Sequence, residues 1–168
     1  IEMPWIYDVA AVCQSWYPGQ AGGNAIADVL FGTDPGGRLP VTFGKTFEDY
    51  PIADPERFPG EDGTVHYDEG LAVGYRYFDG DATDPTYPFG HGHSYAEFAY
   101  CDAELDGAGE TVTVTVANTA DRDGREVVQA YVRPPTLDGV RRPDRELAGF
   151  ASVTVSAGER RTVAIDVD

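Results

Sequence analysis

The pattern of apolar and polar positions changes along this chain, from helical spacing near the N-terminus to strict alternation near the C-terminus. Residues 16–43 read WYPGQAGGNAIADVLFGTDPGGRLPVTF, and Ile26, Val29 and Leu30 within them recur at spacings of three and four. Such spacing places apolar side chains on one face of a helix. We therefore predict a short amphipathic helix at about residues 24–31.

The residues around this helix predict where it begins and ends. Asn24 is a favourable N-cap, and Gly32 stands where a left-handed C-cap is expected. A tight turn at residues 34–37 then leads to a strand near residues 39–43. Together with the apolar patch in residues 1–16, these elements are typical of the closing piece of an α/β layer.

The middle of the chain has a different composition. Residues 44–66 are rich in Pro, Asp, Glu and Gly, which is typical of a long irregular connection. Beyond them Leu71, Val73, Tyr75 and Tyr77 alternate with other residues, and this alternation predicts a strand with the four side chains on one face.

The last third of the chain has the pattern of an all-β domain. Short alternating runs are separated by Gly and Asp clusters, which predicts about five strands after residue 96. Four of these runs are clear: Thr111–Ala117, Glu126–Val132, Leu147–Val155 and Arg161–Val167. An immunoglobulin-like sandwich has about seven strands, so we expect this sandwich to be incomplete, with an unpaired edge.

These observations predict an α+β fold, a partial α/β layer followed by an immunoglobulin- or fibronectin III-like β-sandwich. We expect residues 1–45 to be the C-terminal piece of an α/β sandwich domain. Residues 46–95 are expected to form a connecting arm with a strand pair, and residues 96–168 the truncated β-sandwich.

Composition and charge narrow the possible partners. The 168 residues are 42% apolar and carry a formal net charge of −17, with Lys45 the only lysine. Nucleic acid and anionic membranes are poor partners for such a surface, and no apolar run is long enough to span a membrane. Two hypotheses explain the many acidic residues: they form a site for a cationic ligand or Ca²⁺, or they form a hydrated surface adapted to high salt. Because they are spread along the chain, the second hypothesis is favoured, and folding should then require molar salt.

The termini and cysteines indicate little about a compartment. The first residues lack the features of a signal peptide, which slightly favours a cytoplasmic location, and the missing initiator Met is typical of an internal fragment. Cys13 and Cys101 are too few for a disulfide framework. We expect Cys13, in an apolar stretch, to be a buried free thiol.

Two pairs of polar residues are candidates for chemistry. Glu69, beside Asp68, could be a cleft acid with a raised pKa or a structural carboxylate paired with Arg76. Neighbours in a strand point to opposite faces, so Asp68 and Glu69 cannot easily act on one bond. His91 and His93 could bind a metal, but two ligands make a weak site and the glycines beside them favour a turn. We predict no metal or other cofactor.

Aromatic residues and one arginine are the remaining candidates. Five aromatic side chains could stack on sugar rings or pack in a core: Trp5, Trp16, Tyr17, Tyr75 and Tyr77. Arg38 could pair with a buried carboxylate such as Asp28 or orient the turn that precedes it.

The run at residues 16–43 resembles a segment of the family 3 glycoside hydrolases, the β-glucosidase and β-xylosidase group. The resemblance continues through YDEGLAVGYRYFD (67–79), YPFGHGHSYAEF (87–98) and GREVVQAYVRPP (124–135), so it covers nearly the whole chain. RPDRELAGF (142–150) and SAGERRTVAID (156–166) are similar to the fibronectin III-like tail of the family. The departures are small: Gly36 replaces the usual Ser, His93 the usual Leu and Ala96 the usual Thr.

The resemblance implies that this chain is the C-terminal portion of a retaining glycosidase that acts on terminal β-linked glucose or xylose. It also implies that the nucleophilic Asp lies on a barrel N-terminal to these residues, and that the acid/base Glu precedes them too. The chain would then be a scaffold that needs the missing barrel and α/β half as its partner, and it would be inactive alone. No catalytic residue is assigned, with Glu69 the one candidate; Trp5, Trp16 and Tyr17 are candidates for substrate contacts. The alternative is a stand-alone carbohydrate-binding or interaction module.

Overall fold

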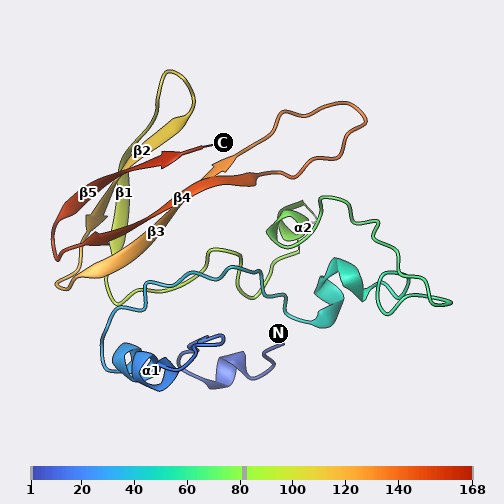
Figure 1. The fold of residues 1–168 in the computed structure, drawn as a ribbon, viewed down its shortest axis with the longest axis horizontal. Helices are drawn as coiled ribbons and strands as arrows, with labels where there is room; N and C mark the ends of the chain where they lie inside the picture. The colour runs from blue at the N-terminus through green and yellow to red at the C-terminus, as the bar shows by residue number, and fades with distance from the viewer. Residues whose placement is uncertain (1, 81–82, 168) are drawn as a thin grey trace. The chain divides into compact units, whose positions relative to one another are not determined.

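The computed structural model describes residues 2–80 and 83–167 of the chain, which divide into two compact units (Figure 1). Unit 1 comprises Ile1–Ile6, Leu39–His91 and Tyr131–Leu147, and unit 2 comprises Tyr7–Arg38, Gly92–Ala130 and Ala148–Asp168. Each unit therefore gathers three stretches that are far apart in the sequence.

Five strands follow residue 96, as the alternation predicts. They are β1 (Phe98–Leu105), β2 (Thr111–Asn118), β3 (Gly124–Val132), β4 (Glu146–Val155) and β5 (Arg160–Asp166). One sheet has three antiparallel strands in the order β1–β2–β5, and the other has β3 beside β4. In the first sheet Val114 lies opposite Val163 and Cys101 opposite Thr115, and the register of β1 then shifts between Cys101 and Glu104.

The core of unit 2 lies between these two sheets. Val114, Val116 and Ile165 come from the three-stranded sheet, and Val128 and Val155 come from the other. Alternate residues of a strand point to the same face, so the valines of β2 face inward while its threonines face outward. Val116 and Val155 have no exposed surface. The sequence prediction of a fibronectin III-like sandwich is confirmed.

The predicted N-terminal helix is present, but it begins earlier than expected. Helix α1 spans Gly22–Leu30, and its N-cap is Ala21 rather than Asn24. The turn that precedes it, closed by a hydrogen bond from the Gly22 N–H to the Gly19 carbonyl, starts the helix two residues sooner.

The predicted C-cap of α1 is confirmed. Gly32 has a φ of +114°, in the region that favours glycine. Its N–H donates to the Val29 carbonyl and the Thr33 N–H donates to the Asp28 carbonyl. These two bonds form a Schellman motif, which satisfies the last carbonyls of the helix.

The strand predicted near residues 39–43 is wrong in extent. Phe43 forms a single bridge with Tyr87, and Leu39 exchanges hydrogen bonds with the 90–91 backbone. Pro40 lies between these contacts and has no N–H to donate, so the ladder is interrupted.

The strand predicted from Leu71 to Tyr77 is also wrong. Gly70 and Gly74 have φ values of +60° and +57°, which break an extended run. The chain then forms helix α2 at Tyr75–Gly80. The alternation of apolar residues predicts a strand there because it carries no information on the positive φ values that the two glycines adopt.

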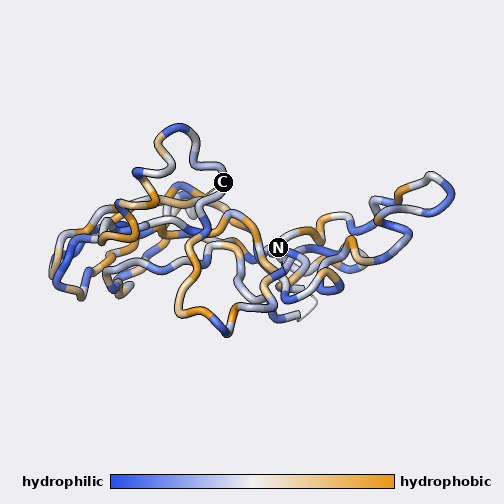
Figure 2. Tube along the Cα trace, turned by 90° about the horizontal axis from the view of Figure 1, so that it is seen from below, coloured by the Kyte–Doolittle hydropathy of each residue, from blue (hydrophilic) through white to orange (hydrophobic). Residues whose placement is uncertain are grey.

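Unit 1 is otherwise built from turns and short 3-10 helices. Two of these, η2 (Phe47–Asp49) and η3 (Pro51–Ala53), lie in the irregular connection, whereas η1 (Ile6–Asp8) spans the boundary at which the chain passes from unit 1 to unit 2. Phe78 of α2 is buried and packs edge-on against Tyr50, with ring centroids 5.6 Å apart. Figure 2 shows apolar and polar residues interspersed along the chain. None of the helices in the described ranges has the length and hydropathy to cross a bilayer.

Residues 11–20 are exposed throughout, which corrects the expectation for Cys13. The apolar neighbours of Cys13 predicted a buried thiol, but the described part of unit 2 leaves Cys13 and these neighbours exposed.

Candidate functional site

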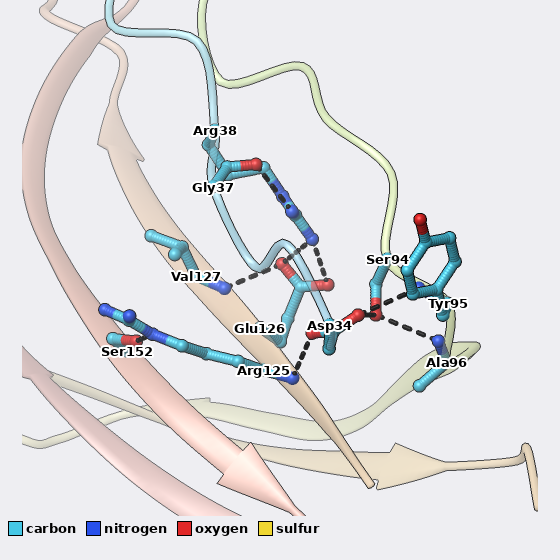
Figure 3. A network of polar contacts seen from close by, with 10 residues as sticks. All are labelled: Asp34, Gly37, Arg38, Ser94, Tyr95, Ala96, Arg125, Glu126, Val127 and Ser152. Carbon is cyan, nitrogen blue, oxygen red and sulfur yellow. Dashed lines mark hydrogen bonds and ion pairs between the residues drawn. The ribbon is translucent and has the colours of Figure 1, made fainter. Parts of the chain in front are cut away.

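A polar junction joins the turn after α1 to the start of β3 in unit 2 (Figure 3). Asp34 is its centre. Asp34 Oδ1 accepts hydrogen bonds from the Ser94 hydroxyl at 2.5 Å and from the Tyr95 N–H at 2.8 Å, and Oδ2 accepts from the Arg125 N–H at 2.8 Å. One short carboxylate thus binds two separate stretches of unit 2. We call the residues around Asp34 and Arg38 the Asp34–Arg38 junction.

The second part of the junction is a buried ion pair. Arg38 Nη2 donates to both carboxylate oxygens of Glu126, at 2.8 and 2.7 Å, and the two side chains are only 10% and 9% exposed. Glu126 Oε1 also accepts the N–H of Val127 at 2.8 Å. Because buried charges must be paired and hydrogen-bonded, these contacts explain how both charges are tolerated.

Tyr100 belongs to the same environment. Burial raises the pKa of its hydroxyl to about 12, and the nearby charge of Glu126 and a hydrogen bond to it act in the same direction. Tyr100 therefore stays neutral under ordinary conditions.

Close backbone approach completes the Asp34–Arg38 junction. A Cβ atom on Gly92 would clash with the carbonyl oxygen of Gly37. Residue 92 can therefore pass this turn only without a side chain.

The chemistry of the junction is structural. Its charged groups are satisfied by one another, by the Ser94 hydroxyl and by backbone N–H groups. The arrangement fixes the turn after α1 on the first residues of β3.

Sequence reasoning located Arg38 but not its partner. Of the two alternatives, a buried carboxylate is present, but it is Glu126 rather than the exposed Asp28. A signal for Glu126 existed in the strand pattern. Glu126 is in phase with Val128 and Ala130, so it must face inward with them, and an inward carboxylate requires a cation.

The structure separates the two carboxylates of the YDEG motif. Asp68 pairs with Arg57 at 2.6 Å, and this hydrogen bond is the main reason that the pKa of Asp68 is lowered. Arg76 lies 3.7 Å from Glu146, and the alternative that pairs Glu69 with Arg76 stays a prediction. Glu69 is half-buried and its backbone carbonyl accepts the N–H of Ala72. A catalytic role for Glu69 stays a prediction.

The aromatic candidates for sugar contacts have exposed rings. Trp5 and Trp16 are each 44% exposed and Tyr17 is fully exposed. Trp5 belongs to unit 1, whereas Trp16 and Tyr17 belong to unit 2. Their role in substrate contacts also stays a prediction.

The two histidines are divided in the same way. His91 belongs to unit 1, where its ring stacks on Tyr87 with centroids 4.7 Å apart, and His93 belongs to unit 2. Within residues 2–80 and 83–167, no group of three or more His, Cys, Asp or Glu side chains is arranged to hold a metal ion.

Unit 1 contains a hollow that the sequence analysis does not predict. Tyr75, at the start of α2, packs against Phe89 and Tyr131, with centroid distances of 5.0 and 6.0 Å. Arg145 and Asp79 lie beside these rings as a bidentate pair, with distances of 2.6 and 2.8 Å. The sequence analysis names Tyr75 as an aromatic candidate. Arg145 is 66 residues from its partner Asp79, so no local pattern indicates that the two meet.

Two families match this chain. Residues 1–95 match the Glycosyl hydrolase family 3 C-terminal domain. Residues 126–168 match the Fibronectin type III-like domain.

Curated relatives are similar over almost the whole chain. A β-glucosidase of Rhizobium radiobacter is 46% identical over 175 residues, covering 99% of this chain and 21% of the relative. Thermostable β-glucosidase B of Acetivibrio thermocellus is 43% identical and covers 100% of this chain and 23% of its own length. An exo-α-(1→6)-L-arabinopyranosidase of Bifidobacterium longum is 45% identical, with 98% and 22% covered. The chain thus spans about a fifth of the length of these relatives.

Solved structures have the same fold over this length. DesR, a β-glucosidase from Streptomyces venezuelae solved in complex with D-glucose, has a TM-score of 0.91 at 39% identity, covering 100% of this chain and 22% of that one. β-Glucosidase 3B from Thermotoga neapolitana, in complex with glycerol, has a TM-score of 0.89 at 36% identity, with 99% and 24% covered.

Proposed function

Since this chain belongs to glycoside hydrolase family 3, we propose that it works as the C-terminal portion of a retaining β-glycosidase. The proposed substrates are terminal β-linked glucosides or xylosides. Its proposed partner is an N-terminal part that contains the barrel and the remainder of the α/β domain. The observation that carries this proposal is that the whole chain aligns with only about a fifth of several β-glucosidases.

The exposed N-terminal stretch of unit 2 supports such a partner. Large apolar side chains are exposed here, among them Tyr7 (96%), Tyr17 (fully) and Phe31 (92%). Exposed apolar surface of this kind is typical of an interface. A protein part that packs against residues 7–31 would cover it.

The reaction chemistry supports a division of labour. A retaining glycosidase needs two carboxyl groups about 5–5.5 Å apart, one as nucleophile and one as acid/base. In the YDEG motif Asp68 is held by Arg57, and we propose that Glu69 is not catalytic either. Both catalytic carboxylates would then come from the partner, and this chain would position the parts that carry them.

The proposed scaffold has three segments. Residues 1–45 would complete the α/β domain, residues 46–95 would connect it, and residues 96–168 would form the β-sandwich. The Asp34–Arg38 junction fits this role, because it fixes the end of the family-like run on β3 through Arg125 and Glu126.

The acidic composition supports a second, independent proposal, that the protein works in concentrated salt. The net charge of −17 is spread along the sequence, and self-repulsion on such a surface is screened when the Debye length falls to about 3 Å at 1 M salt.

A chimera tests the proposed function. The aligned C-terminal fifth of the Rhizobium radiobacter β-glucosidase is replaced by this chain, and hydrolysis of p-nitrophenyl β-D-glucopyranoside is measured. We expect activity from the chimera. We expect none from the Rhizobium radiobacter enzyme truncated at the point of fusion, and none from the 168-residue chain alone. Turnover by the isolated chain would contradict the division of labour, and an inactive but folded chimera would contradict the scaffold role.

Glu69→Gln in the chimera tests the remaining carboxylate. Because the catalytic carboxylates are proposed to lie elsewhere, we expect kcat to stay within about threefold of the unmodified chimera. A loss of about a thousandfold or more would assign Glu69 to the reaction.

A further inference from the structure

We propose that unit 1 has a binding site for one neutral pyranose ring, in the hollow beside Tyr75. We call it the Tyr75 hollow and define it by six of its lining residues: Thr42, Tyr75, Asp79, Phe89, Tyr131 and Arg145. Its volume is about 260 Å³. This site stands on the geometry of unit 1 and does not depend on a glycosidase function.

Part of the lining of the Tyr75 hollow is aromatic. The Tyr75 ring lies 5.0 Å from Phe89 at an interplanar angle of 31°, and 6.0 Å from Tyr131 at 79°. These rings are half-buried, which holds them in place while leaving part of their surface in the hollow. Aromatic surface of this kind packs against the C–H face of a sugar.

Polar groups beside these rings can match neighbouring hydroxyl groups. Arg145 Nε and Nη2 donate to the two carboxylate oxygens of Asp79. Further guanidinium N–H groups remain as donors, and each carboxylate oxygen keeps acceptor capacity. A pair of adjacent sugar hydroxyls can therefore donate to Asp79 and accept from Arg145 at the same time.

Charge and size select the class of ligand. The Arg145–Asp79 pair is neutral as a unit, and Asp84 at the hollow disfavours an anion. The position that an organic cation would take over the Tyr131 ring is occupied by the Arg145 guanidinium, 5.1 Å from the ring centroid. The volume is below the range of about 300–1,000 Å³ of sites for larger ligands. A single neutral ring rich in hydroxyl groups fits all three conditions.

Amide NMR spectra of the 168-residue chain, titrated with methyl β-D-glucopyranoside, test this proposal. We expect saturable shifts confined to amides that surround the Tyr75 hollow, with a dissociation constant of about 1 mM or weaker, as is usual for so small a ligand. Sodium acetate and tetramethylammonium chloride should leave these amides unchanged. Absence of saturable shifts, or shifts centred elsewhere, would overturn the proposal.

Matched variants separate the hollow from general effects on unit 1. Arg145→Lys keeps the charge but removes the planar fork, so binding should weaken by about tenfold. Arg57→Lys alters another ion pair of unit 1, with Asp68, and should leave the affinity unchanged. Equal affinity in all three proteins would contradict the assignment. If Arg145→Lys does not fold, the location of the shifts in the unmodified chain decides. Because no N-terminal part is present, these outcomes are separate from those of the chimera.

Discussion

At Arg38 and Glu126, two opposite charges lie almost out of contact with solvent, and each would be costly without the other. Arg38 belongs to the run that carries the family likeness, whereas Glu126 is 88 residues further along the chain. The local pattern could predict that Glu126 faces inward, but not which cation meets it. Pairing over such a separation depends on the complete fold.

Removing one member of this pair should destabilise unit 2. We expect Arg38→Met to lower the free energy of unfolding by about 3 kcal/mol, because Glu126 is left as an uncompensated buried charge. The double variant Arg38→Met/Glu126→Leu should recover part of this loss. Urea denaturation followed by circular dichroism measures both.

The exposed pair of Arg161 and Glu159 provides the control. Their side chains are 58% and 55% exposed, so Arg161→Met should change the free energy of unfolding by about 0.5 kcal/mol or less. Similar losses in Arg38→Met and Arg161→Met would show that the Arg38–Glu126 pair has no special role.

Tyr100 should make the chain less stable in alkali. Its pKa is raised from 10 to about 12 in the folded chain, so folding favours the neutral hydroxyl. This contribution is complete below about pH 10 and is lost as the pH rises through about 12. The effect is reduced by solvent, since Tyr100 is 53% exposed. The urea midpoint should therefore fall between about pH 10 and pH 12, and Tyr100→Phe should make this fall smaller. Tyr7→Phe, at an exposed position, is the control and should leave the fall of the urea midpoint unchanged. If Tyr100→Phe also leaves this fall unchanged, Tyr100 is not its cause.

At the scale of elements, alternation predicted the strands of the sandwich well because inward valines and outward threonines leave little choice of register. It failed where the backbone conformation of single residues decides. Pro40 interrupts one predicted strand, and Gly70 and Gly74 turn another into α2. The C-cap of α1 was predictable because Gly32 has one clear role there.

Close packing between strands predicts the effect of one glycine substitution. A Cβ atom on Gly149 of β4 would clash with the Asp166 carbonyl oxygen and the Ile165 side chain of β5. We expect Gly149→Ala to lower the free energy of unfolding by about 1–3 kcal/mol, as overpacking does. Gly107→Ala is the control, since nothing lies within 4 Å of its added methyl group. Equal stability of the two variants in urea would contradict this account.

At the scale of the whole molecule, the pattern of apolar and polar positions predicted the class of fold but not how each unit is assembled from separate stretches. The sandwich and the N-terminal helix follow from local periodicity. Each unit, however, combines three separate stretches, and contacts such as Arg145 with Asp79 join residues 66 apart. Local patterns carry no information on such pairings, which is why the sequence analysis names Tyr75 as an aromatic candidate but does not predict the hollow around it.

The net charge of −17 gives a prediction for the complete chain. Because salt screens self-repulsion, we expect the melting temperature to rise with KCl from about 0.1 M to 3 M. Most of the rise in melting temperature should occur below about 1 M KCl, where the Debye length shortens most. Stabilisation by salting-out would instead continue to raise the melting temperature above about 1 M. Equal melting temperatures at the two ends of the range would exclude salt adaptation.

The Asp34–Arg38 junction also affects how β3 can associate. Arg125 and Val127 are two residues apart, so their N–H groups point to the same edge of the strand. Both donors are already bonded, one to Asp34 and the other to Glu126. An incoming strand from another molecule would need these same donors for its ladder, so the two carboxylates protect this end of β3 against unwanted β-augmentation.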